Sequence, residues 1–346
     1  IYVNGSEITS FSTETNATLN NNSGYNVSGT SYAIGRYNPS QAQDYYFNGS
    51  YSHIHFIDGV QHDADTFGSI DATTGIWIPK TSPSVTYGTN GFFLKGENSS
   101  ALGTDSSGKG NDFAVNGTPT QTVDTPANVF ATLNPLENFY AQSTFANGNT
   151  TLTTDTNYSF NTSTLGFSKG KYYWEAKITA TNNDVFGITG RTNPGATTNE
   201  LGHFADGWGF KSNDGAIRNN NTDTSYTSAF NTNGNIVQIA VDITNLKLYL
   251  GVNGTWQVSS NPSTNTGGVT IGAISTTTDG LYFVGVGDYS GGTATYQFNF
   301  GNGVFGSTPL TGTTYSDTAS LGIFKYEVPT GYYSLCTENI NEQEYS

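Results

Sequence analysis

Three of the four histidines in this 346-residue chain lie close together, as His53, His55 and His62. His53 and His55 stand two positions apart in a strand-like segment, so their side chains would share one face and could bind one metal ion. Nothing nearby completes the tetrahedral ligand set that zinc takes. The favoured interpretation is that these rings lie at a strand surface or donate to loop carbonyls. The sequence therefore predicts neither a metal site nor a cofactor.

Acidic residues beside the histidines could hold calcium, as Asp58-Gly59 and Asp63-Ala64-Asp65. Calcium takes about six to eight oxygen ligands, gathered from several loops. A pair of carboxylates supplies too few of them. Turn formation, in which an Asp side chain accepts its own backbone N–H groups, is the favoured interpretation.

Candidate catalytic carboxylates are isolated in this sequence. A glycosidase needs two carboxyl groups across a cleft, about 5–10 Å apart. Glu175 stands alone, and Asp242 ends its segment without an acidic neighbour two residues away. We expect Glu175 to face solvent or to pair with Lys177 or a cross-strand partner. Cys336 has no histidine near it in the sequence, which favours a buried thiol, so we expect no enzymatic activity.

Aromatic residues in polar loops fit ligand binding better. Sugars stack an apolar face on a ring, and Asn, Asp and backbone groups satisfy their hydroxyls. Trp256 follows the Asn253-Gly254 turn signal, and Tyr226, Tyr289 and Tyr315 lie in Ser-, Gly- and Thr-rich segments. The predicted binding residues are Trp256, Tyr226 and Tyr289, although packing remains the stronger interpretation for Trp256.

Composition excludes several classes of protein. Twelve Lys and Arg against 27 Asp and Glu give a net charge of −15, which argues against nucleic-acid binding. No apolar run approaches the roughly 18 residues of a membrane span. A single cysteine excludes an internal disulfide framework, so stability must come from a large core or from oligomerisation, and we expect a homo-oligomer.

Alternating apolar residues predict an all-β fold. In the segment 172–180, Tyr172, Trp174, Ala176 and Ile178 share one face, and similar alternation occurs in 236–242 and 246–250. Asn-Gly, the signal for a tight hairpin, occurs eight times. Trp174 and Trp208 lie in such strand segments and are expected in the core. No helix of ordinary length is expected.

The expected organisation has four parts. Residues 1–61 and 136–312 hold the strand patterns of two sandwich or jelly-roll modules, and residues 62–135 form an irregular connector that carries some strands. Residues 313–346 are a C-terminal extension whose acidic end, 338–346, is predicted to be a solvated tail. The absence of Met and the strand-like opening at Ile1 indicate part of a longer polypeptide.

The third part resembles a SPRY domain, a bent β-sandwich used for binding. The resemblance rests on the order and spacing of several segments: Lys171-Tyr172-Tyr173-Trp174-Glu175, Val185-Phe186-Gly187-Ile188, Gly207-Trp208-Gly209-Phe210, Asn253-Gly254-Thr255-Trp256, Leu281-Tyr282-Phe283-Val284-Gly285-Val286 and Phe298-Asn299-Phe300-Gly301.

Residues 1–61 resemble the C-terminal half of a laminin-G-like, concanavalin-A-type jelly roll. The matching segments are Tyr2-Val3-Asn4-Gly5, Ala33-Ile34-Gly35-Arg36 and Ile54-His55-Phe56. The whole arrangement is similar to virion proteins of marine tailed bacteriophages, with connector segments such as Tyr87-Gly88-Thr89-Asn90-Gly91-Phe92, Asp105-Ser106-Ser107-Gly108 and Asn134-Pro135-Leu136.

These resemblances imply a non-enzymatic, tail-fibre-like component on the surface of a virion, outside the cell. It would bind a host-surface glycan or protein and contact other virion subunits. Two alternatives stay open. One is a structural decoration or connector protein that touches only other particle subunits, and the other is a secreted carbohydrate-active enzyme.

Overall fold

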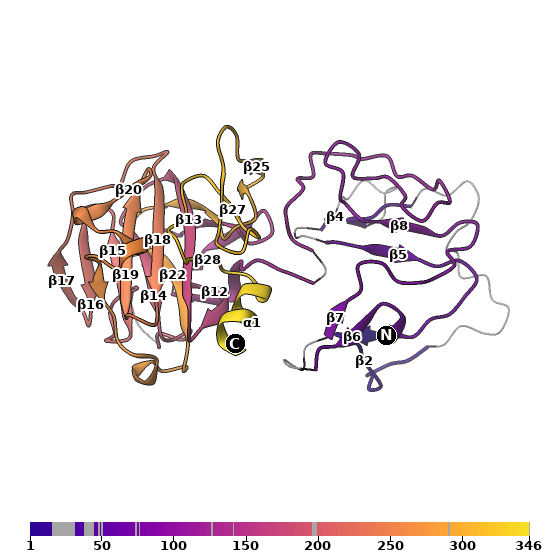
Figure 1. Ribbon diagram of the computed structural model, residues 1–346, viewed down its shortest axis with the longest axis horizontal. Coiled ribbons are helices and arrows are strands. Elements are labelled where there is room, and N and C mark those ends of the chain that lie inside the picture. Colours follow the sequence, from indigo (N-terminus) through magenta and orange to yellow (C-terminus); the bar gives the residue numbers. More distant parts are fainter. Residues whose placement is uncertain are drawn as a thin grey trace. The chain divides into compact units, whose positions relative to one another are not determined.

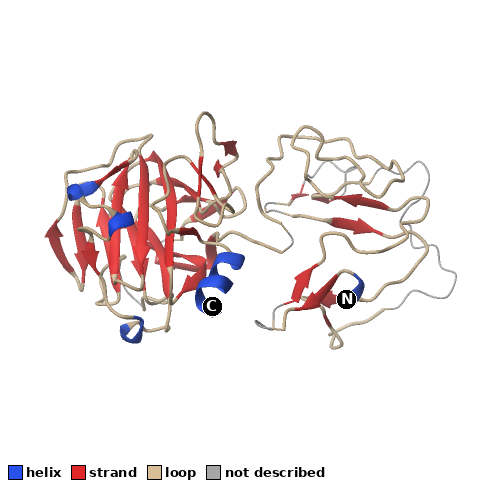
Figure 2. Ribbon diagram, viewed as in Figure 1, coloured by secondary structure: helices blue, strands red, loops and turns tan. Residues whose placement is uncertain are grey.

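The computed structural model describes residues 1–15, 32–37, 45–47, 49, 51–72, 75, 77–125, 127–140, 142–195, 199–289 and 291–345. The chain forms two compact units (Figures 1 and 2). The first unit comprises Ile1–Gln121 and Thr125–Ala127, and the second comprises Thr122–Asp124 and Asn128–Ser346. The boundary expected at residue 61 falls inside the first unit, because β5 (Ile54–Phe56) pairs with β8 (Phe92–Leu94).

The first unit is built from short ribbons. Its other elements are β1 (Tyr2–Val3), β2 (Ser6–Glu7), β3 (Arg36–Tyr37), β4 (Tyr45–Tyr46), the 3-10 helix η1 (Ala64–Thr66), β6 (Gly68–Ile70) and β7 (Trp77–Pro79). Among the described residues of this unit, no sheet exceeds two strands. The half jelly roll expected for residues 1–61 stays a prediction. The hairpin predicted at Asn4-Gly5 is confirmed, with φ of 50° and 78° at these two residues.

The second unit is an antiparallel β-sandwich, which confirms the predicted all-β class. In the described residues, one seven-stranded sheet has the order β17-β16-β15-β14-β22-β12-β9. A nine-stranded sheet has the order β10-β11-β23-β13-β18-β19-β20, with β21 paired to β19 and β28 paired in parallel to β13. The sheet strands are β9 (Leu133–Tyr140), β10 (Thr144–Ala146), β11 (Thr151–Thr153), β12 (Ser159–Phe167), β13 (Lys171–Ala180), β14 (Asp184–Thr189), β15 (Gly207–Lys211), β16 (Ala216–Asn219), β17 (Thr222–Ser225), β18 (Ile236–Asp242), β19 (Lys247–Val252), β20 (Thr255–Trp256), β21 (Val269–Thr270), β22 (Tyr282–Asp288), β23 (Thr295–Asn299) and β28 (Tyr333–Ser334).

Short elements complete this unit. They are η2 (Gln257–Ser259), η3 (Pro262–Thr264), η4 (Ile274–Thr276), β24 (Val304–Phe305), β25 (Thr308–Pro309), β26 (Tyr315–Ser316), β27 (Ile323–Phe324) and the helix α1 (Thr337–Tyr345). The hairpin predicted at Asn253-Gly254 joins β19 to β20, with φ of 49° and 85° at these residues.

The interior between the two sheets is the main core. Trp174 and Trp208 are 1 % and 6 % exposed, as their strand patterns predict. Phe186 from the seven-stranded sheet meets Tyr296 from the nine-stranded sheet edge to face, with ring centres 4.9 Å apart. Because each aromatic ring removes a large apolar area from water, few residues suffice to fill this core.

The C-terminal extension covers the outer face of the nine-stranded sheet. Tyr173 and Tyr249 point away from the main core and pack against Phe324, Val328 and Tyr332. This second aromatic cluster makes the extension a third layer of the same unit. The sandwich of residues 136–312 is thus covered by the chain that follows it.

The final residues form a docked helix, so the prediction of a solvated tail is wrong. Asn339 of α1 is fully buried and its side-chain amide donates to Asp317 and to Ser334. Glu344 accepts the backbone N–H groups of Ser168 and Lys169 at 2.6 and 2.9 Å. These contacts of the Asn339 amide and the Glu344 carboxylate hold α1 against the sandwich. The acidic composition of the segment gives no indication of them.

Candidate functional site

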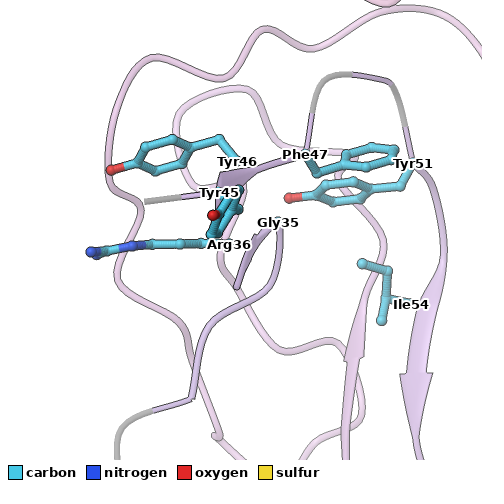
Figure 3. Close-up of a pocket in the computed structure, with 7 residues that line it drawn as sticks. All are labelled: Gly35, Arg36, Tyr45, Tyr46, Phe47, Tyr51 and Ile54. Carbon is cyan, nitrogen blue, oxygen red and sulfur yellow. The ribbon is translucent and has the colours of Figure 1, made fainter. Parts of the chain in front are cut away.

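Exposed aromatic side chains gather around a hollow in the first unit (Figure 3). Tyr45, Tyr46, Phe47 and Tyr51 are 61 %, 66 %, 58 % and 58 % exposed. The hollow measures about 500 Å³ and is lined by Gly35, Arg36, Tyr45, Tyr46, Phe47, Tyr51 and Ile54. We call this set the aromatic hollow. Four large rings in water take no part in a core, and exposed apolar surface of this kind makes the hollow a candidate interaction site.

A short ribbon positions the aromatic hollow. β3 and β4 pair with Arg36 opposite Tyr46, and the Phe47 N–H donates to the Gly35 carbonyl at 2.9 Å. The φ of Gly35 is +78°, which glycine adopts at no steric cost. The Phe47 and Tyr51 rings lie beside each other with centres 6.1 Å apart.

Charge lies at the rim of the hollow. The Arg36 guanidinium carbon is 5.7 Å from the centre of the Tyr46 ring, and Figure 3 shows its side chain extended beside Tyr45 and Tyr46. Aromatic faces can stack against a sugar ring or an apolar side chain, and a guanidinium donates up to five hydrogen bonds. The arrangement suits binding, whereas covalent chemistry would require a nucleophile or an acid–base pair.

Sequence reasoning missed this surface, although a signal exists. Tyr45, Tyr46 and Phe47 are three consecutive aromatic residues. Successive side chains of a strand point to opposite faces, so three in a row cannot all enter one core. At least one ring must remain on the solvent side.

The three predicted binding residues lie against three different apolar clusters. Trp256 is half-buried and meets Tyr173 edge-on at 6.3 Å, on the outer face of the nine-stranded sheet. Tyr226 packs on Phe210 at the margin of the main core, with ring centres 5.2 Å apart. The third, Tyr289, lies on the outer face of the seven-stranded sheet. The structure does not bring them together.

Tyr289 lies beside a cluster of charged side chains, whereas Tyr315 is exposed to solvent. The Lys211 ammonium lies 4.4 Å from the centre of the Tyr289 ring, and it also pairs with Asp214 and Asp223. Tyr315, in β26, is 39 % exposed.

The histidine pair shares one aromatic neighbour, because the rings of His53 and His55 both lie against Phe93. His55 stacks on Phe93 with ring centres 4.0 Å apart, and its Nδ1 lies 2.8 Å from the Tyr87 hydroxyl. Burial, together with the charge of His53, lowers the pKa of His55 to about 4. Among the described residues, no group of three His, Cys, Asp or Glu side chains is placed to hold a metal ion. Asp58 accepts both the backbone and the side-chain N–H of Asn90, 32 positions further along the chain, which is not the local turn contact that the sequence predicts.

Glu175 is fully buried, so the expectation that it faces solvent is wrong. Its carboxylate accepts from the Tyr173 hydroxyl at 2.9 Å and from the backbone N–H groups of Lys325 and Tyr326 at 3.0 and 2.8 Å. Asn299, its cross-strand partner, donates at 3.3 Å. Burial raises the pKa of Glu175, and these donors lower it. This carboxylate holds the C-terminal extension.

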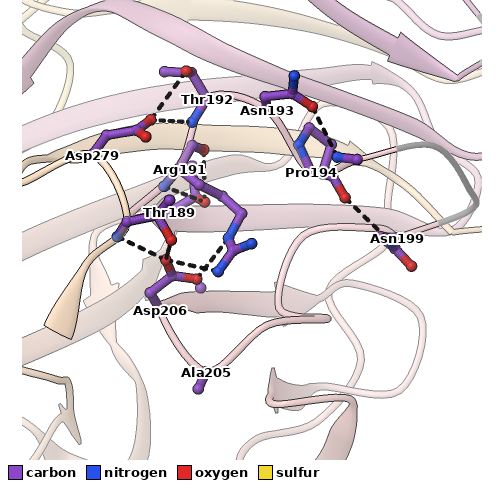
Figure 4. Close-up of polar contacts among 12 residues, drawn as sticks. Thr189, Arg191, Thr192, Asn193, Pro194, Asn199, Ala205, Asp206 and Asp279 are labelled. Atoms are coloured by element: carbon purple, nitrogen blue, oxygen red, sulfur yellow. Dashed lines mark hydrogen bonds and ion pairs between the residues drawn. The ribbon is translucent and has the colours of Figure 1, made fainter.

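An ion pair ties two loops of the sandwich together (Figure 4). Arg191 makes a two-point contact with Asp206 at 2.9 and 3.1 Å, and Thr278 donates to the same carboxylate through its N–H and its hydroxyl. The guanidinium also lies 3.8 Å from the centre of the Phe204 ring. Although burial raises the pKa of Asp206, the Arg191 and Thr278 donors hold it below its usual value. This saturated cluster is a support for the loops.

No family model and no curated protein matches the sequence. Similar solved structures include the SPRY domain of human HERC1, at 15 % identity and a TM-score of 0.36, covering 48 % of this chain and 96 % of that one. A human SPRY domain is similar at 16 % identity and a TM-score of 0.33, covering 43 % and 90 %. Stonustoxin is similar at 17 % identity and a TM-score of 0.37, covering 49 % of this chain and 27 % of its own. Among the described residues, no helix is long and apolar enough to cross a membrane.

Proposed function

We propose that this protein is a non-enzymatic surface component of a tailed-phage virion, and that it attaches to a glycan on the host surface through the aromatic hollow. The observation that carries the proposal is the exposure of Tyr45, Tyr46, Phe47 and Tyr51 around one hollow. Pyranose rings present apolar C–H faces of the size of a tyrosine ring. Flanking hydroxyl and guanidinium groups supply the hydrogen bonds that orient them.

The negative charge of the chain supports attachment through short-range contacts. A net charge of −15 repels anionic cell surfaces at long range. Attachment must then depend on stacking and hydrogen bonds formed at contact. The sandwich of the second unit would serve as the folded support, with its own contacts to other virion subunits.

Binding to immobilised bacterial polysaccharides tests this function. The full chain would be applied to an array of purified lipopolysaccharides and capsular polysaccharides, and to a panel of whole bacterial cells. We expect retention on a subset of the polysaccharides and on the cells that carry them. Retention on cells but not on any polysaccharide would indicate that the receptor is a surface protein instead of a glycan. A folded chain that binds neither would favour a decoration protein that touches only particle subunits.

A further inference from the structure

Two carboxyl groups face the same space at one end of the sandwich. Asp184 begins β14 and Asp288 ends β22, and these strands are antiparallel neighbours in which the two residues stand directly opposite each other. Side chains of directly opposed residues project from the same face of a sheet, with Cβ atoms about 4.5–5.5 Å apart. Both residues are fully buried.

The pair points into the interior between the sheets. The Tyr296 hydroxyl, which comes from the opposite sheet, donates to Asp184 at 2.9 Å. Val286, two residues before Asp288 and on the same face, belongs to the main core. Two carboxylates in an apolar interior repel each other strongly, because little water screens them.

The hydrogen bonds are divided unequally between the two carboxyls. Asp184 accepts from Tyr296, from the Asn182 N–H, and from the hydroxyls of Thr181 and Ser212, at 2.7 to 2.9 Å. Among the described residues, no donor lies at both the distance and the angle of a hydrogen bond from either carboxyl oxygen of Asp288. Donors stabilise the charged form of a carboxyl, so Asp184 holds the negative charge and Asp288 holds a proton.

We propose that Asp184 and Asp288 form a proton-controlled latch, which keeps β14 and β22 closed against the opposite sheet while the pair holds one proton and loosens them when that proton leaves. The groups that face Asp288 are Asp184 on β14, Asp155 in the loop between β11 and β12, and the Tyr296 hydroxyl on β23. None of these carries a positive charge to compensate for ionisation.

The direction of the effect follows from the pKa of Asp288. Burial raises this pKa to about 7, with the charges of Asp184 and Asp155 adding to the rise, while Thr154 and Ser159 oppose it. In the unfolded chain the same carboxyl has a pKa of about 3.9. The folded state therefore binds an extra proton between these values. The stability that this proton adds is complete below about pH 3.9, falls as the pH rises above that value, and is lost once the pH has passed through about 7.

Urea denaturation of the full chain tests the latch. Trp77 lies in the first unit, whereas Trp174, Trp208 and Trp256 lie in the second, so a Trp77→Phe background makes tryptophan fluorescence report on the sandwich alone. In this background we expect the urea midpoint to fall as the pH rises from about 4 to about 7 and to level off above that. Asp288→Asn, which mimics the protonated acid, should flatten this dependence. Glu327→Gln, at an exposed position of the C-terminal extension, should keep it.

Other results would overturn the latch. They are a pH-independent midpoint in the Trp77→Phe background, or an undiminished slope in Asp288→Asn. A midpoint at alkaline pH that added Ca²⁺ restores in Trp77→Phe but not in Asp288→Asn would show that the pair binds a cation instead. If Asp288→Asn does not fold, ¹³C NMR of labelled aspartate carboxyls in the unmodified chain decides. A resonance that titrates near pH 7 supports the latch, and the absence of any such resonance contradicts it.

Discussion

Glu175, in the middle of β13, accepts the backbone N–H groups of Lys325 and Tyr326, 150 and 151 residues further along the chain. A single carboxylate thus fixes the C-terminal extension to the outer face of the nine-stranded sheet. Because Glu175 is fully buried, loss of its charge leaves several donors without a full partner.

Glu175→Gln should destabilise the second unit by about 2–5 kcal/mol, since an amide replaces one acceptor oxygen by a donor that faces other donors. Glu327→Gln is the matched control, because Glu327 lies in the same extension and is exposed. It should change stability by less than about 0.5 kcal/mol. Urea denaturation followed by tryptophan fluorescence measures both, and equal effects would show that the Glu175 contacts contribute little.

Removal of residues 313–346 should unfold the sandwich or leave it loosely packed. The truncation exposes Tyr173 and Tyr249 and takes away Phe324, Val328 and Tyr332. Each of these large side chains contributes about 1.5–3 kcal/mol through burial, which is a large share of a typical domain's stability. Near-ultraviolet circular dichroism of the chain truncated after residue 312 checks this. A native-like spectrum with a cooperative thermal transition would contradict it.

The three tryptophans of the second unit should differ in their contributions. Trp174→Ala and Trp208→Ala each empty a buried site and should cost about 3–5 kcal/mol. Trp256→Ala should cost clearly less, since Trp256 is half-buried and lies outside the main core. The free energies of unfolding of the three variants can be compared directly. A cost at Trp256 as high as at Trp174 would mean that the outer cluster matters as much as the interior.

His55 should titrate far below an ordinary histidine, with a pKa of about 4. Burial against Phe93 disfavours the charged ring, so the fold binds fewer protons than the unfolded chain between this value and about 6.5. The first unit should therefore lose roughly 1–3 kcal/mol of stability as the pH falls through this range. Ring-proton NMR shifts of His55 against pH measure it directly. A midpoint near 6.5 would show that the ring is not packed as described.

Local patterns predicted much of the second unit. The alternation in 172–180 placed Trp174 inside, and Asn-Gly signals located turns, because both depend on neighbours in the chain. The alternation also placed Glu175 on the opposite face. That face is covered by residues 325 and 326, which lie 150 and 151 positions after Glu175. No local pattern reveals so distant a contact.

The candidate sites depended on contacts between distant segments. Asp184 and Asp288 are 104 positions apart in the printed sequence, and only the strand register places them opposite each other. The aromatic hollow forms where β3 meets β4, in a segment interpreted from the sequence as part of a jelly-roll module. Trp256 was selected from its position after a turn signal, and in the fold its ring packs against Tyr173.

Salt should have little effect on attachment. Raising the ionic strength from about 50 to about 500 mM shortens the screening length from roughly 14 to roughly 4 Å, which weakens long-range repulsion and leaves stacking intact. Retention of the full chain on the polysaccharide that gives the strongest array signal should be unchanged or slightly improved over this range. A steep loss with salt would show that ion pairing dominates.

The dissociation constant for that polysaccharide, measured for variants of the aromatic hollow, tests the binding surface most directly. The double variant Tyr46→Ala with Tyr51→Ala removes two exposed rings from the hollow. Loss of two stacking contacts should weaken binding about tenfold or more. Tyr315→Ala removes an exposed tyrosine of the second unit and should leave the constant within about twofold of the unmodified chain. Equal affinity of the double variant and the unmodified chain, with both folded, would contradict attachment through the aromatic hollow.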